Sequence, residues 1–76
     1  MLNEGAERES ERKELEAYLP DKVAFSLPET ARILNRSIHW AREKAASGKL
    51  KSVRIGATVR VTRPVLLDAL MDGVEI

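Results

Sequence analysis

Residues 26–62 read SLPETARILNRSIHWAREKAASGKLKSVRIGATVRVT, and this stretch decides the fold. In its first part, apolar residues recur every three or four positions, which is the spacing of one face of a helix. From residue 51 onward, apolar and polar residues alternate instead, which is typical of β-strands. We therefore expect two short helices followed by a β-hairpin.

The first of these helices begins with a capping pattern. Ser26 is followed three residues later by Glu29, which is the spacing of a capping box. Leu27, Ala31 and Leu34 then lie at positions i, i+4 and i+7 and form one apolar face. The pattern predicts a short helix that buries this face.

The second helix follows a turn at residues 35–36, where asparagine can adopt the left-handed conformation that ends a helix. Ser37 is its predicted N-cap and Gly48 its stop, so we expect a helix over about residues 38–46. At about 100° per residue, its small apolar side consists of Ile38, Ala41 and Ala45. The opposite side is expected to carry Arg36, His39, Trp40 and Glu43. The flanks are expected to carry Arg42 and Lys44.

The two strands of the hairpin flank a turn at Gly56-Ala57. The apolar residues expected to share an inner face are Val53, Ile55, Val59 and Val61. Arg54 and Arg60 alternate with them, so we expect a basic outer face. A closing helix is predicted from Arg63 to about Met71. Its core residues are expected to be Leu66, Leu67 and Leu70.

Charge divides the chain into an acidic part and a basic part. Residues 1–19 contain six glutamates and three basic residues, which gives a net charge of −3. Residues 22–63 contain ten basic residues and two acidic ones, so their net charge is +8 although that of the whole chain is only +1. A compact basic module of this kind suits binding to the phosphate backbone of nucleic acid.

We expect three segments along the chain. Residues 1–21 form an acidic extension, helical from about Glu7 to Leu19, disordered before it and ended by Pro20. Residues 22–73 form the folded domain, and residues 74–76 form a short tail. A chain of 76 residues has room for one small core.

Composition argues against several classes of function. The chain has no cysteine and one histidine, so we expect no disulfide, metal site or other cofactor. No residues are arranged as a catalytic set or a glycine-rich phosphate loop, so we expect no enzyme activity. There is no signal-peptide pattern and no apolar run of about 20 residues, so we expect a cytoplasmic protein without a membrane span.

Several short motifs occur in a fixed order along residues 25–70. They are SLPETARIL at 26–34, SGKL at 47–50, VRIG at 53–56, RV at 60–61, and Leu66 with Leu70. Together they resemble the small excisionase-type DNA-binding domains related to the MerR winged helix. The resemblance implies a mainly helical, winged helix-turn-helix domain with a β-hairpin wing. Its second helix would enter the major groove, and its wing would touch the backbone or the minor groove.

The resemblance also implies a function. The phage members of this family, including excisionases of mycobacteriophage-like actinobacteriophages, bind repeated sites in attachment-site DNA, bend it and direct the phage integrase toward excision. The expected partners are therefore double-stranded DNA, an integrase and further copies arranged head to tail on DNA, in the cytoplasm of a bacterial host. The chain departs from the family at its less basic wing tip, Ala57-Thr58, at His39 and Trp40, and in its acidic extension.

The predicted DNA-binding residues lie on the second helix and on the hairpin with its approach. Those on the helix are Arg36, Ser37, His39, Trp40, Arg42, Glu43 and Lys44. Those on the hairpin and its approach are Lys49, Lys51, Arg54, Thr58 and Arg60. Arg36 is a candidate for reading a guanine edge, and the family pattern makes Arg42 a candidate for holding a phosphate.

Some alternatives stay open. Trp40 suits either the core or a contact with a sugar or a thymine methyl group. Glu43 suits either a bond to cytosine N4 or a salt bridge with Arg36 or Arg42. The whole protein suits either a small transcriptional regulator that binds one operator, or an adaptor that binds protein through its acidic helix.

Overall fold

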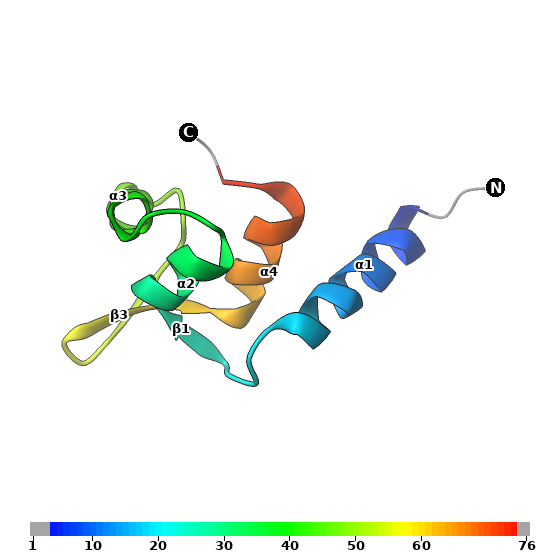
Figure 1. The fold of residues 1–76 in the computed structure, drawn as a ribbon, viewed down its shortest axis with the longest axis horizontal. Coiled ribbons are helices and arrows are strands. Elements are labelled where there is room, and N and C mark those ends of the chain that lie inside the picture. The colour runs from blue at the N-terminus through cyan, green and yellow to red at the C-terminus, as the bar shows by residue number, and fades with distance from the viewer. Residues whose placement is uncertain (1–3, 75–76) are drawn as a thin grey trace.

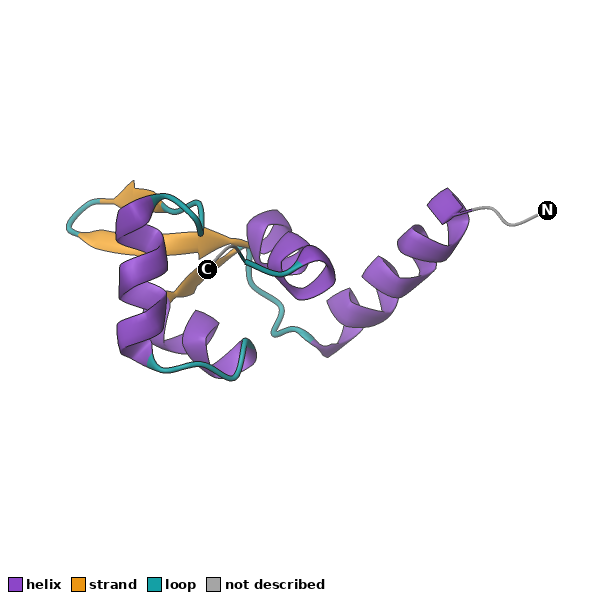
Figure 2. Ribbon diagram, turned by 90° about the horizontal axis from the view of Figure 1, so that it is seen from above, coloured by secondary structure: helices purple, strands orange, loops and turns teal. Residues whose placement is uncertain are grey.

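Four helices and a three-stranded antiparallel sheet make up residues 4–74, the part of the chain that this computed structural model describes (Figure 1). In chain order they are α1 (Glu4–Tyr18), β1 (Ala24–Ser26), α2 (Leu27–Ile33), α3 (Ile38–Ser47), β2 (Val53–Ile55), β3 (Thr58–Thr62) and α4 (Arg63–Asp72). β3 is the middle strand and pairs with both β1 and β2. α2 and α4 contact β3, α3 contacts α2, and α1 projects from the body beside α4 (Figure 2).

α2 begins where the sequence predicts, because Ser26 and Glu29 form a complete capping box. Ser26 Oγ accepts a hydrogen bond from the Glu29 backbone N–H at 3.2 Å, and the Ser26 N–H donates to Glu29 Oε1 at 3.0 Å. The Lys22 ammonium pairs with the other carboxylate oxygen of Glu29. Hydrogen bonds from Lys22 and from the Ser26 backbone lower the pKa of Glu29 from its ordinary 4.5 to about 2.

The turn between α2 and α3 also follows the prediction. Asn35 has a φ of 57°, in the left-handed region, and the next N–H, that of Arg36, donates to the Ala31 carbonyl at 2.8 Å. Ser37 is the N-cap of α3, and its Oγ accepts a hydrogen bond from the Trp40 N–H at 3.1 Å. α3 ends one residue later than predicted, at Ser47, before Gly48 in the left-handed conformation. Local capping chemistry therefore sets the positions of both helices.

The core draws one side chain from each of several elements. Its central cluster is Phe25, Leu50, Val61 and Leu66, which are at most 1% exposed. They come from β1, the segment after α3, β3 and α4, so the core ties the sheet to the helices. Burial of Leu66 and Leu67 confirms their predicted role, and Leu70 is half-buried against the same cluster. Each fully buried apolar side chain of this size contributes about 1.5–3 kcal/mol.

The β2–β3 hairpin corrects the prediction of one apolar and one basic face. Val53 pairs with Arg60 and Ile55 pairs with Thr58, while Arg54 pairs with Val59. Directly opposed residues of an antiparallel pair lie on the same face. Each face of the hairpin therefore carries both apolar and basic side chains, and Ile55 is 57% exposed instead of buried.

The length of the turn explains this arrangement. Gly56 has a φ of 64° and Ala57 does not have a positive φ, which is typical of a two-residue type II′ turn. A two-residue turn after residue 55 pairs each odd-numbered position with an even-numbered one. The four apolar positions of the two strands all have odd numbers, so they cannot oppose one another. The prediction treated each strand alone and missed this constraint.

α1 begins earlier than predicted and is attached to α4 by ion pairs. It starts at Glu4, so residues 4–6 are helical and not disordered, while the prediction for residues 1–3 lies outside the described residues. Acidic residues near a helix N-terminus favour such a start. Arg8 contacts Asp72 at 2.9 Å and Arg12 contacts Asp68 at 2.7 Å. The hydrogen bond from Arg8 to Asp72 raises the pKa of Arg8.

The link between α1 and the body depends on Arg63, the first residue of α4. Its guanidinium donates to the backbone carbonyls of Pro20, Lys22 and Glu16 at 2.6, 2.9 and 2.9 Å. Its Nε also lies 3.5 Å from the Glu16 carboxylate. One side chain therefore holds the end of α1 and the segment that follows it against α4.

In residues 4–74, no helix has both the length and the apolar composition needed to cross a membrane.

Candidate nucleic-acid interface

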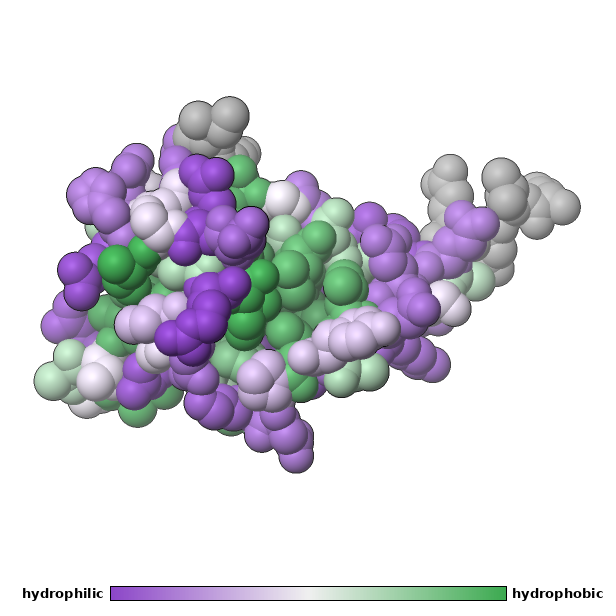
Figure 3. All heavy atoms as spheres, in the orientation of Figure 1, coloured by the Kyte–Doolittle hydropathy of each residue, from purple (hydrophilic) through white to green (hydrophobic). Residues whose placement is uncertain are grey.

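α3 presents one polar side to solvent, and His39 lies on it. His39, Arg42 and Glu43 are all exposed, whereas Ala41 on the opposite side is 0% exposed. The small side chain of Ala41 lets α3 contact α2 closely. Figure 3 shows hydrophilic residues around α3 and over α1, with an apolar area between them. The exposed side of α3 is therefore available to a ligand as large as a nucleic acid.

Three arginines line two clefts between α3 and the β2–β3 hairpin. Arg42 and Arg54 line a cleft of about 350 Å³ between α3 and the hairpin. Arg42 also lines an adjoining cleft of about 290 Å³ with Arg60 and Thr58. We call these three arginines with the two clefts the arginine groove. Among the described residues, no acidic side chain lines either cleft.

The structure thus brings together four of the predicted residues from separate parts of the chain. The hairpin register places Arg54 and Arg60 on opposite faces, and Arg42 borders the cleft on each side. The Thr58 hydroxyl donates to the Ile55 carbonyl at 2.8 Å, so part of its hydrogen-bonding capacity is used within the turn. Ser52 also lines the larger cleft. Sequence reasoning missed it because a serine ahead of a strand has no distinguishing pattern.

The other flank of α3 forms a second site, around Trp40. The Arg36 guanidinium carbon lies 5.1 Å from the centre of the Trp40 ring, which is a cation–π distance. Trp40 is half-buried, so it is neither a core residue nor fully exposed. We call the cleft of about 510 Å³ beside it the tryptophan cleft. Its lining residues are Leu34, Arg36, Trp40, Glu43, Lys44, Ala69, Gly73 and Val74.

Lys44 is a correction to the prediction. It was expected on an accessible flank of the helix, but only 6% of its surface is exposed. It follows the buried Ala41 by three residues and therefore points to the same side of α3. Its Nζ lies 3.9 Å from Glu43 Oε1, so the ion pair of Glu43 is with Lys44 and not with Arg36 or Arg42. Its stem lies along the apolar part of the tryptophan cleft.

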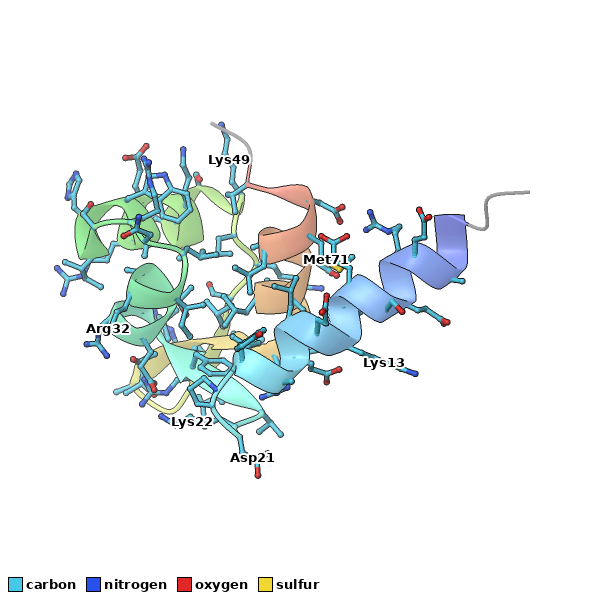
Figure 4. All side chains as sticks on the ribbon, turned by 45° about the vertical axis from the view of Figure 1, so that its right-hand side comes forward. Lys13, Asp21, Lys22, Arg32, Lys49 and Met71 are labelled. Carbon is cyan, nitrogen blue, oxygen red and sulfur yellow. The ribbon has the colours of Figure 1, made fainter. Side chains whose placement is uncertain are left out.

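Two other predicted residues lie elsewhere. Lys49 and Lys51 line a separate cleft together with Asp68 and Asp72 of α4. Figure 4 shows Lys49 beside the end of α4, whereas Arg32 points outward from α2. The structure does not join these lysines to the arginine groove.

Ser37 was predicted to contact DNA, and in the structure it also caps α3. Its hydroxyl oxygen accepts the N-cap hydrogen bond described above, so its lone pairs are partly used. The residue is nevertheless exposed at the start of α3. A hydroxyl that accepts in this way can still donate its proton to a ligand.

Comparisons with known proteins add no relative to this picture. No protein-family model matches the chain, and neither curated proteins nor solved structures give a significant match. The fold and the site define the class of protein: a small, mainly helical domain with a three-stranded antiparallel sheet. Its basic surface spans one helix and a hairpin.

Proposed function

We propose that this protein binds double-stranded DNA as a winged-helix domain, with α3 in the major groove and the β2–β3 hairpin as a wing on the backbone. The arginine groove is the observation that carries this proposal. A guanidinium can hold a phosphate through two parallel hydrogen bonds and stays charged at physiological pH. Three guanidinium groups lie around the two clefts, and no acidic side chain of the described residues lines either cleft. This arrangement suits an extended polyanion such as DNA.

The dimensions of α3 support the same assignment. A helix with its side chains is about 10–12 Å across, and the major groove of B-DNA is about 12 Å wide. His39 lies on the exposed side of α3 and is proposed to face base edges. Arg42, Arg54 and Arg60 are proposed to hold phosphates and so to fix the orientation of α3.

At a finer level, we propose an architectural role of the excisionase type in the cytoplasm of a bacterial host. The resemblance of residues 25–70 to that family supports this role. Copies bound head to tail on repeated attachment sites would bend the DNA and direct an integrase toward excision. Smooth bending of a site by about 40–90° costs on the order of 1–6 kcal/mol, which contacts to DNA and between copies must offset.

The first experiment identifies the preferred DNA and tests whether it is bent. Bound duplexes are selected from a random library. The affinity and the bending of the selected duplexes are then compared with those of scrambled duplexes by gel shift and by circular permutation. Stepwise, cooperative complexes with strong bending are the expected result. A single unbent complex would instead favour a transcriptional regulator with one operator. Equal weak binding to every duplex would favour the adaptor that acts through α1.

The second experiment tests the arginine groove directly. Arg42→Ala should weaken binding to all duplexes and reduce the slope of log K against log salt by about 0.9, because one phosphate contact is lost. Lys13→Ala is the matched control, since Lys13 is an exposed cation on α1. An unchanged slope for Arg42→Ala would remove its phosphate role.

A further inference from the structure

We infer that the tryptophan cleft holds one backbone phosphate of bound DNA, on the strand opposite the one that the arginine groove contacts. The inference rests on the proposed DNA binding and adds a second anchor to it. The ligand group is a phosphodiester, with its phosphate at Arg36 and Lys44 and an adjoining deoxyribose against the Trp40 ring.

The first argument is the burial of the Lys44 side chain. Its side chain is 8% exposed, and its one acidic neighbour among the described residues is Glu43, at 3.9 Å. That distance is beyond a hydrogen bond, and Glu43 itself is 62% exposed. A buried cation is costly unless it is paired. Lys44 lines the tryptophan cleft, so its positive charge lies close to any anion that enters the cleft.

The second argument is the chemistry of the cleft wall. Arg36 is held over the Trp40 ring, which fixes a second cation at the same opening. Leu34, Ala69 and Val74 supply apolar surface, and residues of α3 and of the end of α4 line the cleft. Two fixed cations beside an aromatic ring match a phosphate that carries a sugar on each side.

The third argument is the position of the cleft relative to the arginine groove. Arg42 and Lys44 are two residues apart on α3 and therefore point about 200° apart around its axis. A helix in the major groove has a phosphate wall on each side, one from each strand. The arginine groove lies on one flank of α3 and the tryptophan cleft on the other. The two sites therefore match the two walls.

Glu43 opposes a phosphate in this cleft, and its role follows from that. In the free protein its carboxylate partly balances Lys44. When a phosphate enters, Lys44 exchanges this distant carboxylate for a direct anionic partner. Removing the charge with Glu43→Gln should therefore strengthen binding to every duplex by about two- to fivefold. If Glu43 only accepted a bond from cytosine, the same change would weaken binding to the preferred site alone.

The test is the salt dependence of binding by variants of the two cations. Lys44→Met keeps the aliphatic stem and removes the charge, and Arg36→Gln changes an exposed residue that leaves the core intact. Because both cations serve one phosphate, each single variant should reduce the slope of log K against log salt by less than about 0.9, and the double variant should reduce it by about 0.9. Lys13→Met on α1 is the control and should leave the slope unchanged. Circular dichroism establishes that each variant is folded.

Neutral methylphosphonates then locate the contact along the selected duplex. Replacing the phosphate in the tryptophan cleft should weaken wild-type binding and leave binding by the double variant of Arg36→Gln and Lys44→Met unchanged. For Arg42→Ala, the methylphosphonate position that no longer affects binding should lie on the other strand. The inference is overturned if the methylphosphonate positions that no longer affect binding lie on the same strand for the tryptophan-cleft variant and for Arg42→Ala.

The two proposals fail in different ways. If the wild type binds no duplex at low salt, DNA binding itself is wrong. If Arg42→Ala lowers the slope but the double variant of Arg36→Gln and Lys44→Met does not, DNA binding stands and the phosphate in the tryptophan cleft is refuted.

Discussion

Replacing Arg63 with alanine should release α1 while the core stays folded. The guanidinium of Arg63 makes three hydrogen bonds to backbone carbonyls that join the end of α1 and the following segment to α4. Its side chain is 20% exposed, so these bonds are only partly shielded from water. The neighbouring ion pair with Glu16, at 3.5 Å, adds to the same contact.

The size of the effect follows from these contacts. A hydrogen bond to a charged group contributes about 1.5–3 kcal/mol when it is intact, but surface carbonyls recover water when the donor is lost. We therefore expect the three bonds together to contribute about 2–3 kcal/mol, and the exposed ion pair to add less than about 1 kcal/mol. A loss of this size would accelerate amide exchange in α1 by about 30- to 150-fold.

Hydrogen exchange followed by NMR measures the protection of each backbone amide. In Arg63→Ala, amides of α1 should lose protection, whereas those of Phe25 and Val61 in the sheet should change little. Arg12→Ala is the matched control, because it removes one exposed ion pair, with Asp68. The reasoning is refuted if α1 keeps its protection in Arg63→Ala, or if Arg12→Ala releases α1 to the same extent.

Three further changes test the fold. Phe25→Ala removes a fully buried ring, so urea titration should show a loss of about 3–5 kcal/mol, and a loss below about 1 kcal/mol would contradict the core assignment. Glu29 has a pKa of about 2 in the folded chain against an ordinary 4.5, so its stabilising effect is present above pH 4.5 and is lost as the pH falls toward 2. Urea midpoints of wild type and Glu29→Gln should therefore differ at neutral pH and converge between pH 4.5 and 2, and a constant difference would count against the capping box. Asn35→Val should destabilise the fold by about 1–2 kcal/mol, because the φ of residue 35 is 57°. Asn35→Gly should be nearly neutral in thermal unfolding. Equal effects of the two variants would be inconsistent with a left-handed conformation at residue 35.

The helix starts and the turn between α2 and α3 were predictable because their signals are local. Ser26 with Glu29, Asn35 and Ser37 each act on backbone groups within about four residues. These interactions form in the same way whatever the rest of the chain does. The order of the elements and the positions of α2 and α3 therefore followed from the sequence.

The features that sequence reasoning missed depend on distant parts of the chain. The burial of Lys44 depends on how α3 is rotated against α2 and α4, which periodicity alone leaves undetermined. The pairs of Arg8 and Arg12 with α4 join residues 64 and 56 positions apart. For the candidate site, charge indicated a basic module but not that α3 divides its residues between two clefts.

The two-residue turn of the β2–β3 hairpin has a consequence for how such a domain can diversify. Inserting one residue at the start of β3, with the turn kept at two residues, would shift the pairing by one, bring the apolar positions of the two strands opposite one another and move the arginines to a common face. Insertion or deletion of a single codon would thus redistribute the charge of the hairpin without any substitution. Relatives that differ only by such a one-residue shift of register would present different surfaces to the same ligand.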